Sequence, residues 1–450
     1  MKVKMRLFFI LFILSLNITL VFGYSSIKFY KNSSSISISS SPGEALLIVM
    51  NETIDESIDV ISTDSEGNIY LVFEVGDDIA LAKYDKFGTL LWIKTWGGSM
   101  AEYVHSLYID NFNNIFITGS TDSFGNSTDL FVLKYDLDGN LLKNATWGTP
   151  TVDVGYDLVS DDLGNIYVCG YAYGYSNFSL LLKLDKNLNY LWNVTWKRSD
   201  KYNNRAKNIV FDGVFIYLSI ETQIPMSSNC DIGLNCYNTS GTLLWNTTYG
   251  EGGYREYPES LDLDPEGNVY ISGETTWPST TPTKYGFLLI KYNSEGGLSW
   301  AKIWGDDLNN WDGAIQTDYD GDVFLAGTTQ NYDASIMDVY IAKIDRLDRS
   351  IEWYTLWDGG RRESLLDFYI DKRNNDMYLV VSTNAFSLKS EYKIVIVKNP
   401  TLPSPSNTSV QGNDLLSDIL ILGLGLIAIA SISSLIITII HYRKKLKSNR

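Results

Sequence analysis

The chain has 450 residues, with 36 Lys and Arg against 53 Asp and Glu, giving a formal net charge of −17 at pH 7. Apolar residues make up 45% and charged residues 20%, which is typical of a folded globular protein and excludes a disordered chain. Three cysteines and two histidines exclude a disulfide-built scaffold and a His-based zinc site. The acidic balance argues against a nucleic-acid partner, because phosphate binding needs clustered Lys and Arg.

Residues 1–23 are typical of an export signal, because three cations precede the apolar run Leu7–Phe22 and Gly23 offers a small-residue cleavage site. An uncleaved anchor is the alternative. Residues 24–44 then form a lead segment.

The other end predicts a membrane anchor. Residues 419–440 contain no charge and are long enough to cross a hydrocarbon core of about 30 Å. The basic tail 441–450 follows, so the positive-inside rule places the C-terminus in the cytoplasm. The two ends hold eight of the cations, so the exported part between them carries about −25. We expect a single-pass cell-membrane protein with its N-terminal part outside.

Sequons for N-glycosylation agree with export. Asn-x-Ser/Thr begins at Asn32, Asn51, Asn126, Asn144, Asn177, Asn193, Asn238, Asn246 and Asn407.

The sequence between the ends repeats itself. Asp-x-x-Gly-Asn-Ile-Tyr occurs at Asp64–Tyr70 and Asp161–Tyr167, and with Val for Ile at Asp264–Tyr270. Four degraded copies bring the number to seven, with a period near 50 residues. A second motif, exemplified by Lys83–Trp92 followed by Trp96 and Gly97, recurs inside the periods. Each period therefore predicts four short antiparallel strands, a to d, which is the pattern of a propeller blade.

The last repeat has strands a, b and c but no strand d. Leu46–Met50 precedes the first strand a and matches Leu90–Lys94, which lies in a strand d. We infer that this N-terminal segment completes the last blade and removes a free edge. The prediction is an all-β, seven-bladed propeller over residues 45–398, a stalk rich in Pro, Ser and Asn at 399–418, and one transmembrane α-helix.

The paired motifs resemble the seven-bladed β-propeller repeat family of the SBBP type, found in secreted and surface proteins. The resemblance covers about residues 45–398 and implies a fold rather than an activity, since one propeller scaffold hosts many functions.

The predicted turns differ in length between the two faces of the propeller. The a–b and c–d turns are tight, whereas the b–c connections are longer and irregular, and function usually lies on long loops. Strand c of the last blade runs toward the tight-turn face and leads into the stalk, so we expect the long-loop face to point outward. The ligand-binding candidates on that face are Tyr171, Tyr173, Tyr175, Trp277, Tyr285, Tyr332, Asp122, Asp129, Asp306 and Asp307. Aromatic rings with carboxylates suit sugars or cationic groups, although each tyrosine could instead pack on its own blade.

The tryptophans favour packing between blades over a cofactor site. The repeat is similar to the tryptophan-docking segment of quinoprotein dehydrogenases, but the Thr of that pattern and its adjacent cysteines are missing, so no quinone cofactor is expected. His105 lies on a strand a without a nucleophile motif, and a structural role is favoured. Cys230 and Cys236 are too far apart along one strand for a disulfide, so free thiols are expected.

Asp318, Asp320 and Asp322 have oxygen ligands at alternate positions, as calcium loops do. An ordinary turn is the favoured reading, which leaves calcium as a weak possibility and no other cofactor or metal. The leading functional hypothesis is a non-catalytic binding or adhesion module for an extracellular glycan, cation or protein. The alternatives are a carboxylate-dependent enzyme acting on polysaccharide and a structural envelope protein.

Overall fold

The computed structural model describes residues 46–54, 58–86, 88–125, 127–174, 177–199, 202–223, 229–250, 254–276, 285–304, 310–330, 337–345, 349–357, 362–373, 375–383 and 391–398. Within these residues every regular element is a β-strand, and no helix is present that is long and apolar enough to cross a membrane. The signal, the stalk and the transmembrane segment predicted from the sequence lie outside the described residues.

The 28 strands of the described residues form seven four-stranded antiparallel sheets. Six of them are built from consecutive strands, and we number these blades 1 to 6. Blade 1 contains β2 (Ile58–Thr63), β3 (Ile69–Val75), β4 (Asp78–Tyr84) and β5 (Leu90–Trp96). Blade 2 contains β6 (Glu102–Ile109), β7 (Ile115–Thr121), β8 (Asp129–Tyr135) and β9 (Leu141–Trp147). Blade 3 contains β10 (Asp153–Ser160), β11 (Ile166–Ala172), β12 (Phe178–Leu184) and β13 (Tyr190–Trp196). Blade 4 contains β14 (Asn203–Phe211), β15 (Phe215–Gln223), β16 (Cys230–Asn238) and β17 (Leu243–Tyr249). Blade 5 contains β18 (Glu256–Leu263), β19 (Val269–Thr276), β20 (Tyr285–Tyr292) and β21 (Leu298–Trp304). Blade 6 contains β22 (Asn310–Thr317), β23 (Val323–Gln330), β24 (Met337–Ile344) and β25 (Ile351–Trp357).

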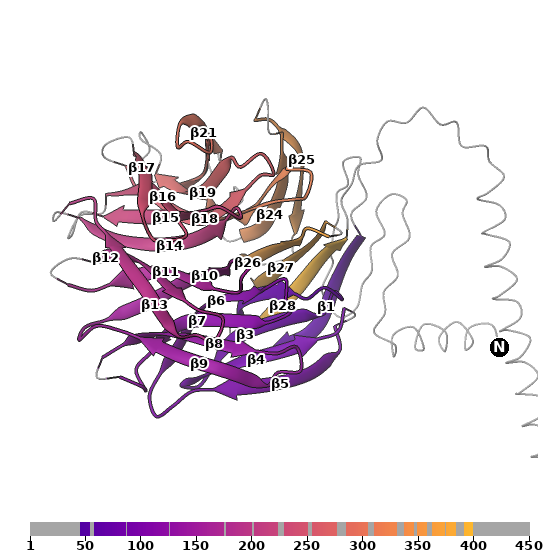
Figure 1. Cartoon of the computed structure of the whole chain (residues 1–450). Coiled ribbons are helices and arrows are strands. Elements are labelled where there is room, and N and C mark those ends of the chain that lie inside the picture. Colours follow the sequence, from indigo (N-terminus) through magenta and orange to yellow (C-terminus); the bar gives the residue numbers. More distant parts are fainter. Residues whose placement is uncertain are drawn as a thin grey trace, which may run out of the picture. The chain divides into compact units, whose positions relative to one another are not determined.

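The seventh sheet, called the closing sheet here, joins the two ends of the described chain. It contains β26 (Glu363–Asp371), β27 (Asp376–Thr383), β28 (Glu391–Lys398) and the N-terminal β1 (Leu46–Ile54), in the order β1-β28-β27-β26. Figure 1 shows β1 lying beside β28, and the register pairs Leu46 with Lys398. The N-terminal segment therefore supplies the outer strand that the last repeat lacks.

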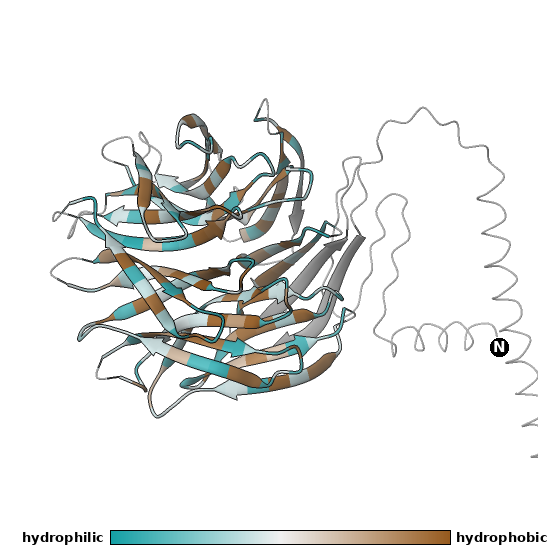
Figure 2. Ribbon diagram, in the orientation of Figure 1, coloured by the Kyte–Doolittle hydropathy of each residue, from teal (hydrophilic) through white to brown (hydrophobic). Residues whose placement is uncertain are grey.

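The sheets pack around one axis. The first strand of each repeat, called the inner strand, contacts the inner strands of both neighbouring sheets, and the cycle closes where β26 meets β2. Apolar side chains of adjacent sheets share seven core clusters, one at each junction. Figure 2 shows the hydrophobic residues spread along the strands, with hydrophilic residues at the connections. The described residues thus form an all-β propeller.

The first sequence motif is explained by a turn that closes on its own aspartate. In blade 1 the Asp64 carboxylate accepts hydrogen bonds from the backbone N–H groups of Glu66 and Asn68, both at 2.9 Å. The hydroxyl of Tyr70, at the end of the motif, donates to the same carboxylate at 2.9 Å. Gly67 has a φ of +81°, which a residue with a Cβ adopts only with strain. The motif therefore encodes one tight turn between strands a and b.

The lysine of the second motif returns to this turn. Lys83 Nζ lies 3.4 Å from Asp64 Oδ2 and 5.1 Å from the centre of the Tyr70 ring. Lys183 and Lys291 repeat both contacts with the Asp and Tyr of their own blades. Although burial alone raises the pKa of Asp64, its hydrogen bonds with Asn68, Tyr70 and Glu66 bring that pKa below the ordinary value.

The tryptophans of strand d pack between blades, as the sequence predicted. Trp92 of blade 1 lies against the core cluster that contains Phe131 and Leu133 of blade 2. Its ring also covers Gly139 in the following blade, where an added Cβ would lie 3.0 Å from Trp92. The pair Trp192 and Gly241 repeats this contact. A ring placed in this way is a structural side chain, held in the core by its neighbours.

Candidate functional site

Each of the seven inner strands carries a β-bulge, which in β2 lies at the start of the strand. The register shifts lie at Ile58/Val60, Val104/Ser106, Gly155/Asp157, Ala206/Asn208, Pro258/Ser260, Trp311/Ala314 and Leu365/Asp367. A bulge leaves one residue outside the pairing pattern and re-aims its side chain. The extra residues whose side chains are described are Asp59, His105, Tyr156, Lys207, Glu259 and Leu366, and we call this set the axial ring.

Glycine in the neighbouring strand makes room for three of these bulges. At Gly119, Gly170 and Gly273 an added Cβ would lie within 1.9 Å of a backbone carbonyl oxygen of the inner strand. Blade 4 has Ile220 at the corresponding place, and there Gly233 of the next strand lies against the Ile220 side chain. In blades 2, 3 and 5 the room for the bulge is therefore encoded by a glycine.

Three consecutive members of the axial ring contact one another. The rings of His105 and Tyr156 have centroids 5.0 Å apart, and Lys207 Nζ lies 4.1 Å from the centre of the Tyr156 ring. Each residue comes from a different blade, so the contacts join blades 2, 3 and 4 at the axis. His105 is exposed, and Tyr156 and Lys207 are half-buried, although all three lie on inner strands. Solvent therefore reaches these side chains.

The protonation states of His105 and Tyr156 follow from their surroundings. Although the His105 side chain keeps contact with solvent, desolvation by the protein around it, with the charge of Lys207 second, lowers its pKa to about 4. Burial, with Tyr171 second, raises the pKa of Tyr156 to about 12. At neutral pH these shifts leave a neutral imidazole and a neutral phenol beside Lys207.

Asp59 precedes His105 around the axial ring and has an unusual environment. Its Oδ2 atom is buried and makes no hydrogen bond with any described residue. Burial, with the nearby charge of Glu74 second, raises the pKa of Asp59 to about 7. A carboxyl group in such a place is readily protonated near neutral pH.

The residues after the bulges tie neighbouring sheets together. Ser106 Oγ donates to Asp157 at 2.7 Å, and Asp157 accepts the backbone N–H of Ile209 in the next blade at 3.0 Å. At the ring closure Asp367 accepts the backbone N–H of Ile61 at 2.8 Å. Burial raises the pKa of both Asp157 and Asp367 to about 6 despite these hydrogen bonds. These aspartates are structural links between sheets.

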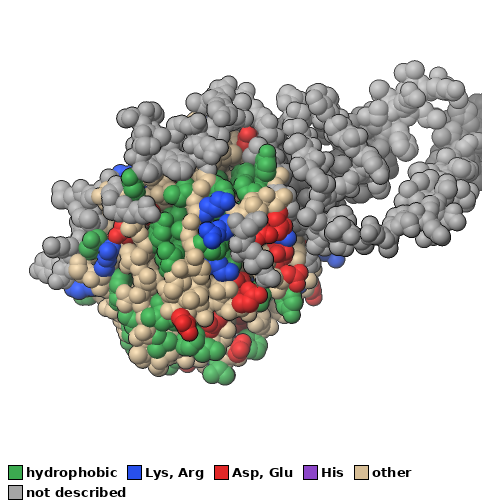
Figure 3. Space-filling model, turned by 90° about the horizontal axis from the view of Figure 1, so that it is seen from above, with side chains coloured by type: hydrophobic (Ala, Val, Ile, Leu, Met, Phe, Trp, Pro, Cys, Tyr) green, Lys and Arg blue, Asp and Glu red, His purple; other side chains and the backbone are tan. Residues whose placement is uncertain are grey.

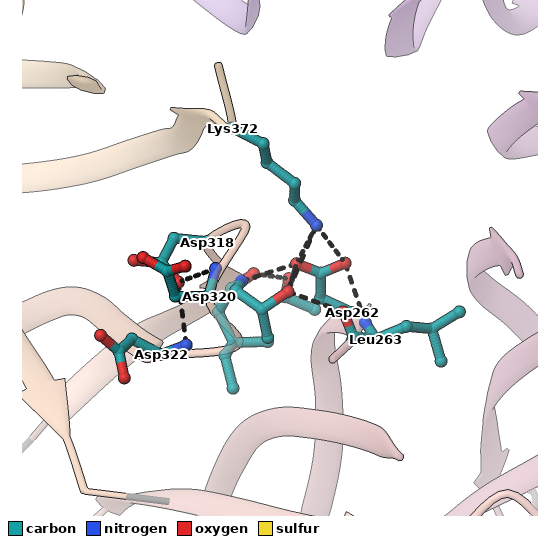
Figure 4. Close-up of polar contacts among 9 residues, drawn as sticks. Asp262, Leu263, Asp318, Asp320, Asp322 and Lys372 are labelled. Atoms are coloured by element: carbon teal, nitrogen blue, oxygen red, sulfur yellow. Dashed lines mark hydrogen bonds and ion pairs between the residues drawn. The ribbon is translucent and has the colours of Figure 1, made fainter. Parts of the chain in front are cut away.

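The predicted calcium candidates form an ordinary turn. Asp318 Oδ1 accepts the backbone N–H groups of Asp320 and Asp322 at 3.0 and 2.9 Å, and Asp322 pairs with Lys343 at 2.7 Å. Figure 4 shows Asp318, Asp320 and Asp322 in this turn with the two hydrogen bonds drawn as dashed lines. Across the described part of the chain, no group of three or more His, Cys, Asp or Glu side chains is placed to hold a metal ion.

A cross-sheet ion pair lies close to that turn. Lys372, from the turn that follows β26, reaches both oxygens of Asp262 in β18 at 3.2 and 3.1 Å, and it donates to Thr317 of β22 at 3.2 Å (Figure 4). The closing sheet is thereby linked to blades 5 and 6 at once. Lys372 is already occupied by these contacts and has a structural role.

The loop-face candidates are only partly brought together. Tyr171 lies at the end of β11, with its ring 5.8 Å from that of Tyr156 and the guanidinium of Arg205 5.5 Å from its centre. Arg205 is itself paired with Glu221 at 3.0 Å. Tyr173 is 53% exposed and stands beyond the strand. Tyr171 is thus the candidate that joins the loop face to the axial ring.

The remaining candidates are dispersed or lie outside the description. Asp122 accepts a hydrogen bond from Thr128 at 2.6 Å, and Asp129 packs beneath Gly148, where an added Cβ would lie 2.1 Å from its carboxylate. Tyr285 begins β20. Tyr175, Trp277, Tyr332, Asp306 and Asp307 lie outside the described residues.

The sequons differ in accessibility. Asn144 and Asn246 are exposed on outer strands, whereas Asn193 accepts a hydrogen bond from the Tyr190 hydroxyl at 2.9 Å and Asn238 accepts one from the backbone N–H of Thr242 at 2.9 Å. Asn177 is only 4% exposed. With its amide oxygen facing Arg205, it accepts a hydrogen bond from Nε at 3.0 Å, so a glycan there would have to displace a buried contact. Asn32, Asn126, Asn407 and the side chain of Asn51 lie outside the description.

The three cysteines are free, buried thiols. Cys169 lies in β11, Cys230 lies at one end of the pairing between β16 and β15, and Cys236 pairs with Tyr217 in the same ladder. Because they are buried, these thiols contribute to the packing of the core.

Comparisons with known proteins give distant similarities. No family model matches the chain, so the resemblance to the SBBP-type repeat family rests on the motifs alone. An uncharacterized WD repeat-containing protein of Acanthamoeba polyphaga mimivirus is 23% identical over 252 residues, which cover 50% of this chain and 15% of that protein. The chain thus spans a small part of that relative's length.

Solved structures give similarities of the same kind. The β-propeller domain of the Trilobed protease from Pyrococcus furiosus is 11% identical, with a TM-score of 0.47, covering 80% of this chain and all of that one. A protein from Lactobacillus plantarum is 13% identical, with a TM-score of 0.46, covering 74% of this chain and 96% of that one. The all-β propeller fold of this chain rests on the strands and sheets described above.

Proposed function

We propose that this protein is a membrane-anchored, cell-surface propeller that acts as a non-catalytic binding or adhesion module through its loop face. In this proposal the closing sheet serves as the seventh blade, and residues 419–440 anchor the chain with the C-terminus in the cytoplasm. The ligand would be an extracellular glycan, a cationic group or a partner protein.

One observation carries the proposal: the two ends of the blades are built by different rules. At one end each a–b turn is closed by its own aspartate, including Asp64, Asp110, Asp161 and Asp264. At the other end the b–c connections vary from Gly76 and Asp77 alone in blade 1 to residues 277–284 in blade 5. Uniform turns maintain the scaffold, whereas variable loops on a rigid scaffold commonly carry recognition.

The distribution of surface charge favours selective recognition of a ligand over unspecific adhesion. Figure 3 shows a face on which Lys and Arg side chains gather in a small group beside Asp and Glu side chains. Such local pairing of opposite charges favours recognition by complementary groups over adhesion through one large field of a single sign.

Blade 1 supplies the design of a test. Its two-residue connection shows that this scaffold tolerates a short b–c turn, so residues 277–284 can be replaced by Gly-Asp with little risk to the fold. Cells displaying the full chain are screened against immobilised glycans and surface extracts, and the loop-replaced chain is then tested on the strongest ligand. The proposal expects a loss of binding of at least tenfold.

The matched control lies on the opposite face. Leu163, in an a–b turn, is 78% exposed, and Leu163→Ser should leave binding unchanged. Equal binding by the loop-replaced chain and the wild type, together with weaker binding by the turn variant, would assign recognition to the tight-turn face and overturn the proposal.

A further inference from the structure

We propose that His105, Tyr156 and Lys207 form a binding site for a small carboxylate ion at the axis of the propeller. The three residues are bulge positions in the middle of inner strands β6, β10 and β14 and do not belong to the b–c loops.

The three side chains retain hydrogen-bond donors that no described residue uses. Lys207 contacts the Tyr156 ring, but no carboxylate of the described residues lies within ion-pair distance of its ammonium group. The Tyr156 hydroxyl and the His105 imidazole likewise make no hydrogen bond with the described residues, and their rings touch. Three adjacent polar groups thus retain their donors, and all three have access to solvent. Ammonium, phenol and neutral imidazole are donors that a carboxylate accepts.

Lys207 is the one free cation of the described inner strands. Only Arg205 and Lys207 carry a positive charge on these seven strands. Arg205 is already bound to Glu221 and lies over Tyr171. An anion entering the axis would therefore find its counter-charge at Lys207.

The neighbouring charges limit the ligand to a single negative charge. In the axial ring Asp59 precedes these three residues and Glu259 follows them, and Asp157 lies in the inter-sheet link that joins blades 2, 3 and 4. These carboxyl groups would repel phosphate dianions and polycarboxylates more strongly than a monocarboxylate. The aromatic rings of Tyr156 and His105 add an apolar wall against which a short carbon chain can pack.

The test uses the full-length chain in detergent micelles, with histidine labelled by ¹³C in the imidazole ring. Sodium acetate is titrated at pH 7.5 against sodium chloride of equal ionic strength, and the His105 ring signal is followed by NMR. A saturable shift with acetate and none with chloride is expected. Lys207→Met should weaken acetate binding at least tenfold, whereas Lys143→Met, which removes an exposed charge from the outer strand β9, should leave it unchanged.

Tyr156→Phe keeps the ring and the neighbouring charge, so it tests the hydroxyl even where the lysine variant folds poorly. It should weaken binding severalfold, and thermal unfolding of both variants separates loss of binding from loss of fold. Absence of a saturable acetate shift, undiminished binding by both variants, or tighter binding of inorganic phosphate or citrate than of acetate would overturn the proposal.

Discussion

The ammonium group of Lys83 in blade 1 donates a hydrogen bond of 3.2 Å to the backbone carbonyl of Leu137 in blade 2. The same side chain lies 3.4 Å from Asp64 in its own blade. Lys183 repeats the arrangement by donating to the carbonyl of Thr239 at 3.2 Å. One lysine in each such blade therefore closes its own turn and fastens the next blade.

The lysine contacts predict a stability defect. Lys83→Met keeps most of the aliphatic stem but leaves Asp64 without its counter-charge and Leu137 without its donor, so the free energy of unfolding should fall by about 1–3 kcal/mol. Urea unfolding of the purified full chain measures the change. Lys143→Met removes an equal charge from an exposed site and should stay within about 0.5 kcal/mol of the wild type. Equal stability of the two variants would contradict this role of Lys83.

The bulge geometry predicts different costs at two glycines. At Gly170 an added Cβ would lie 1.8 Å from the carbonyl oxygen of Val154, so Gly170→Ala must displace backbone and should cost about 1–3 kcal/mol. Gly213 has a φ of +95° and nothing within 4 Å of an added Cβ, so Gly213→Ala should cost only about 1 kcal/mol through backbone strain. Thermal unfolding of both variants checks the order, and a larger loss at Gly213 would contradict it.

Asp59 predicts a pH dependence. Its pKa rises from 3.8 to about 7 on folding, so the folded chain binds more protons than the unfolded chain between these values. The contribution of this group to stability is fully present below about pH 4 and is lost as the pH rises through about 7. Asp59→Asn should therefore be more stable than the wild type at pH 8 and should show a flatter stability profile between pH 4 and 7. Urea unfolding at pH 5 and pH 8 measures both.

The control for this experiment is Asp162→Asn, at an exposed turn position, which should follow the wild-type profile. His105 acts in the opposite direction, since its lowered pKa makes stability rise as the pH increases from about 4 to 6.5. A wild-type profile unchanged by Asp59→Asn would show that Asp59 titrates normally in the folded chain.

The closing sheet predicts the effect of removing its outer strand. Deletion of Leu46–Ile54 exposes the edge of β28 and leaves a three-stranded sheet. Unpaired edges recruit other strands, so the deleted protein should self-associate and unfold at lower temperature than the wild type. Size-exclusion chromatography and thermal unfolding measure these effects. Deletion of residues 24–44 alone, which retains β1, should leave the elution volume and melting temperature near those of the intact chain.

The repeating scaffold could be predicted from the sequence, because each motif residue has a local task. Asp64, Gly67 and Tyr70 specify one turn whose hydrogen bonds lie within seven residues of chain, and such a turn is recognisable without tertiary information. The role of the tryptophans could also be predicted, since a ring that recurs in most blades serves a purpose common to blades.

The axial ring was missed, although the sequence contains a signal for it. Strict alternation places apolar residues two apart, but the buried pairs Ile58 and Ile61, Val104 and Leu107, Ala206 and Ile209, and Leu365 and Phe368 are three apart on inner strands. That spacing requires one extra residue between them, which is a bulge. Which side chains then meet at the axis depends on contacts between residues about 50 positions apart, and a single sequence does not reveal them.

The loop face was the least predictable part. Tyr171 could be chosen for its place at the end of a strand, but its contacts with Tyr156 and Arg205 join three separate segments. Asp129 was chosen for its charge, yet it packs beneath Gly148 as part of the scaffold. Residue type indicates what a side chain is able to bind, whereas its neighbours decide whether it is already engaged.

The pairing of β1 with β28 also has a consequence during synthesis. The first strand of the described chain leaves the ribosome before every other strand, and its partner is the last to follow. While blades 1 to 6 form in turn from neighbouring segments, β1 must wait through the translation of nearly the whole propeller, which takes tens of seconds at about 5–20 residues per second. The nascent chain therefore carries an exposed strand for most of its production, and a chaperone or translocation factor that shields this strand would determine how much of the protein completes its ring.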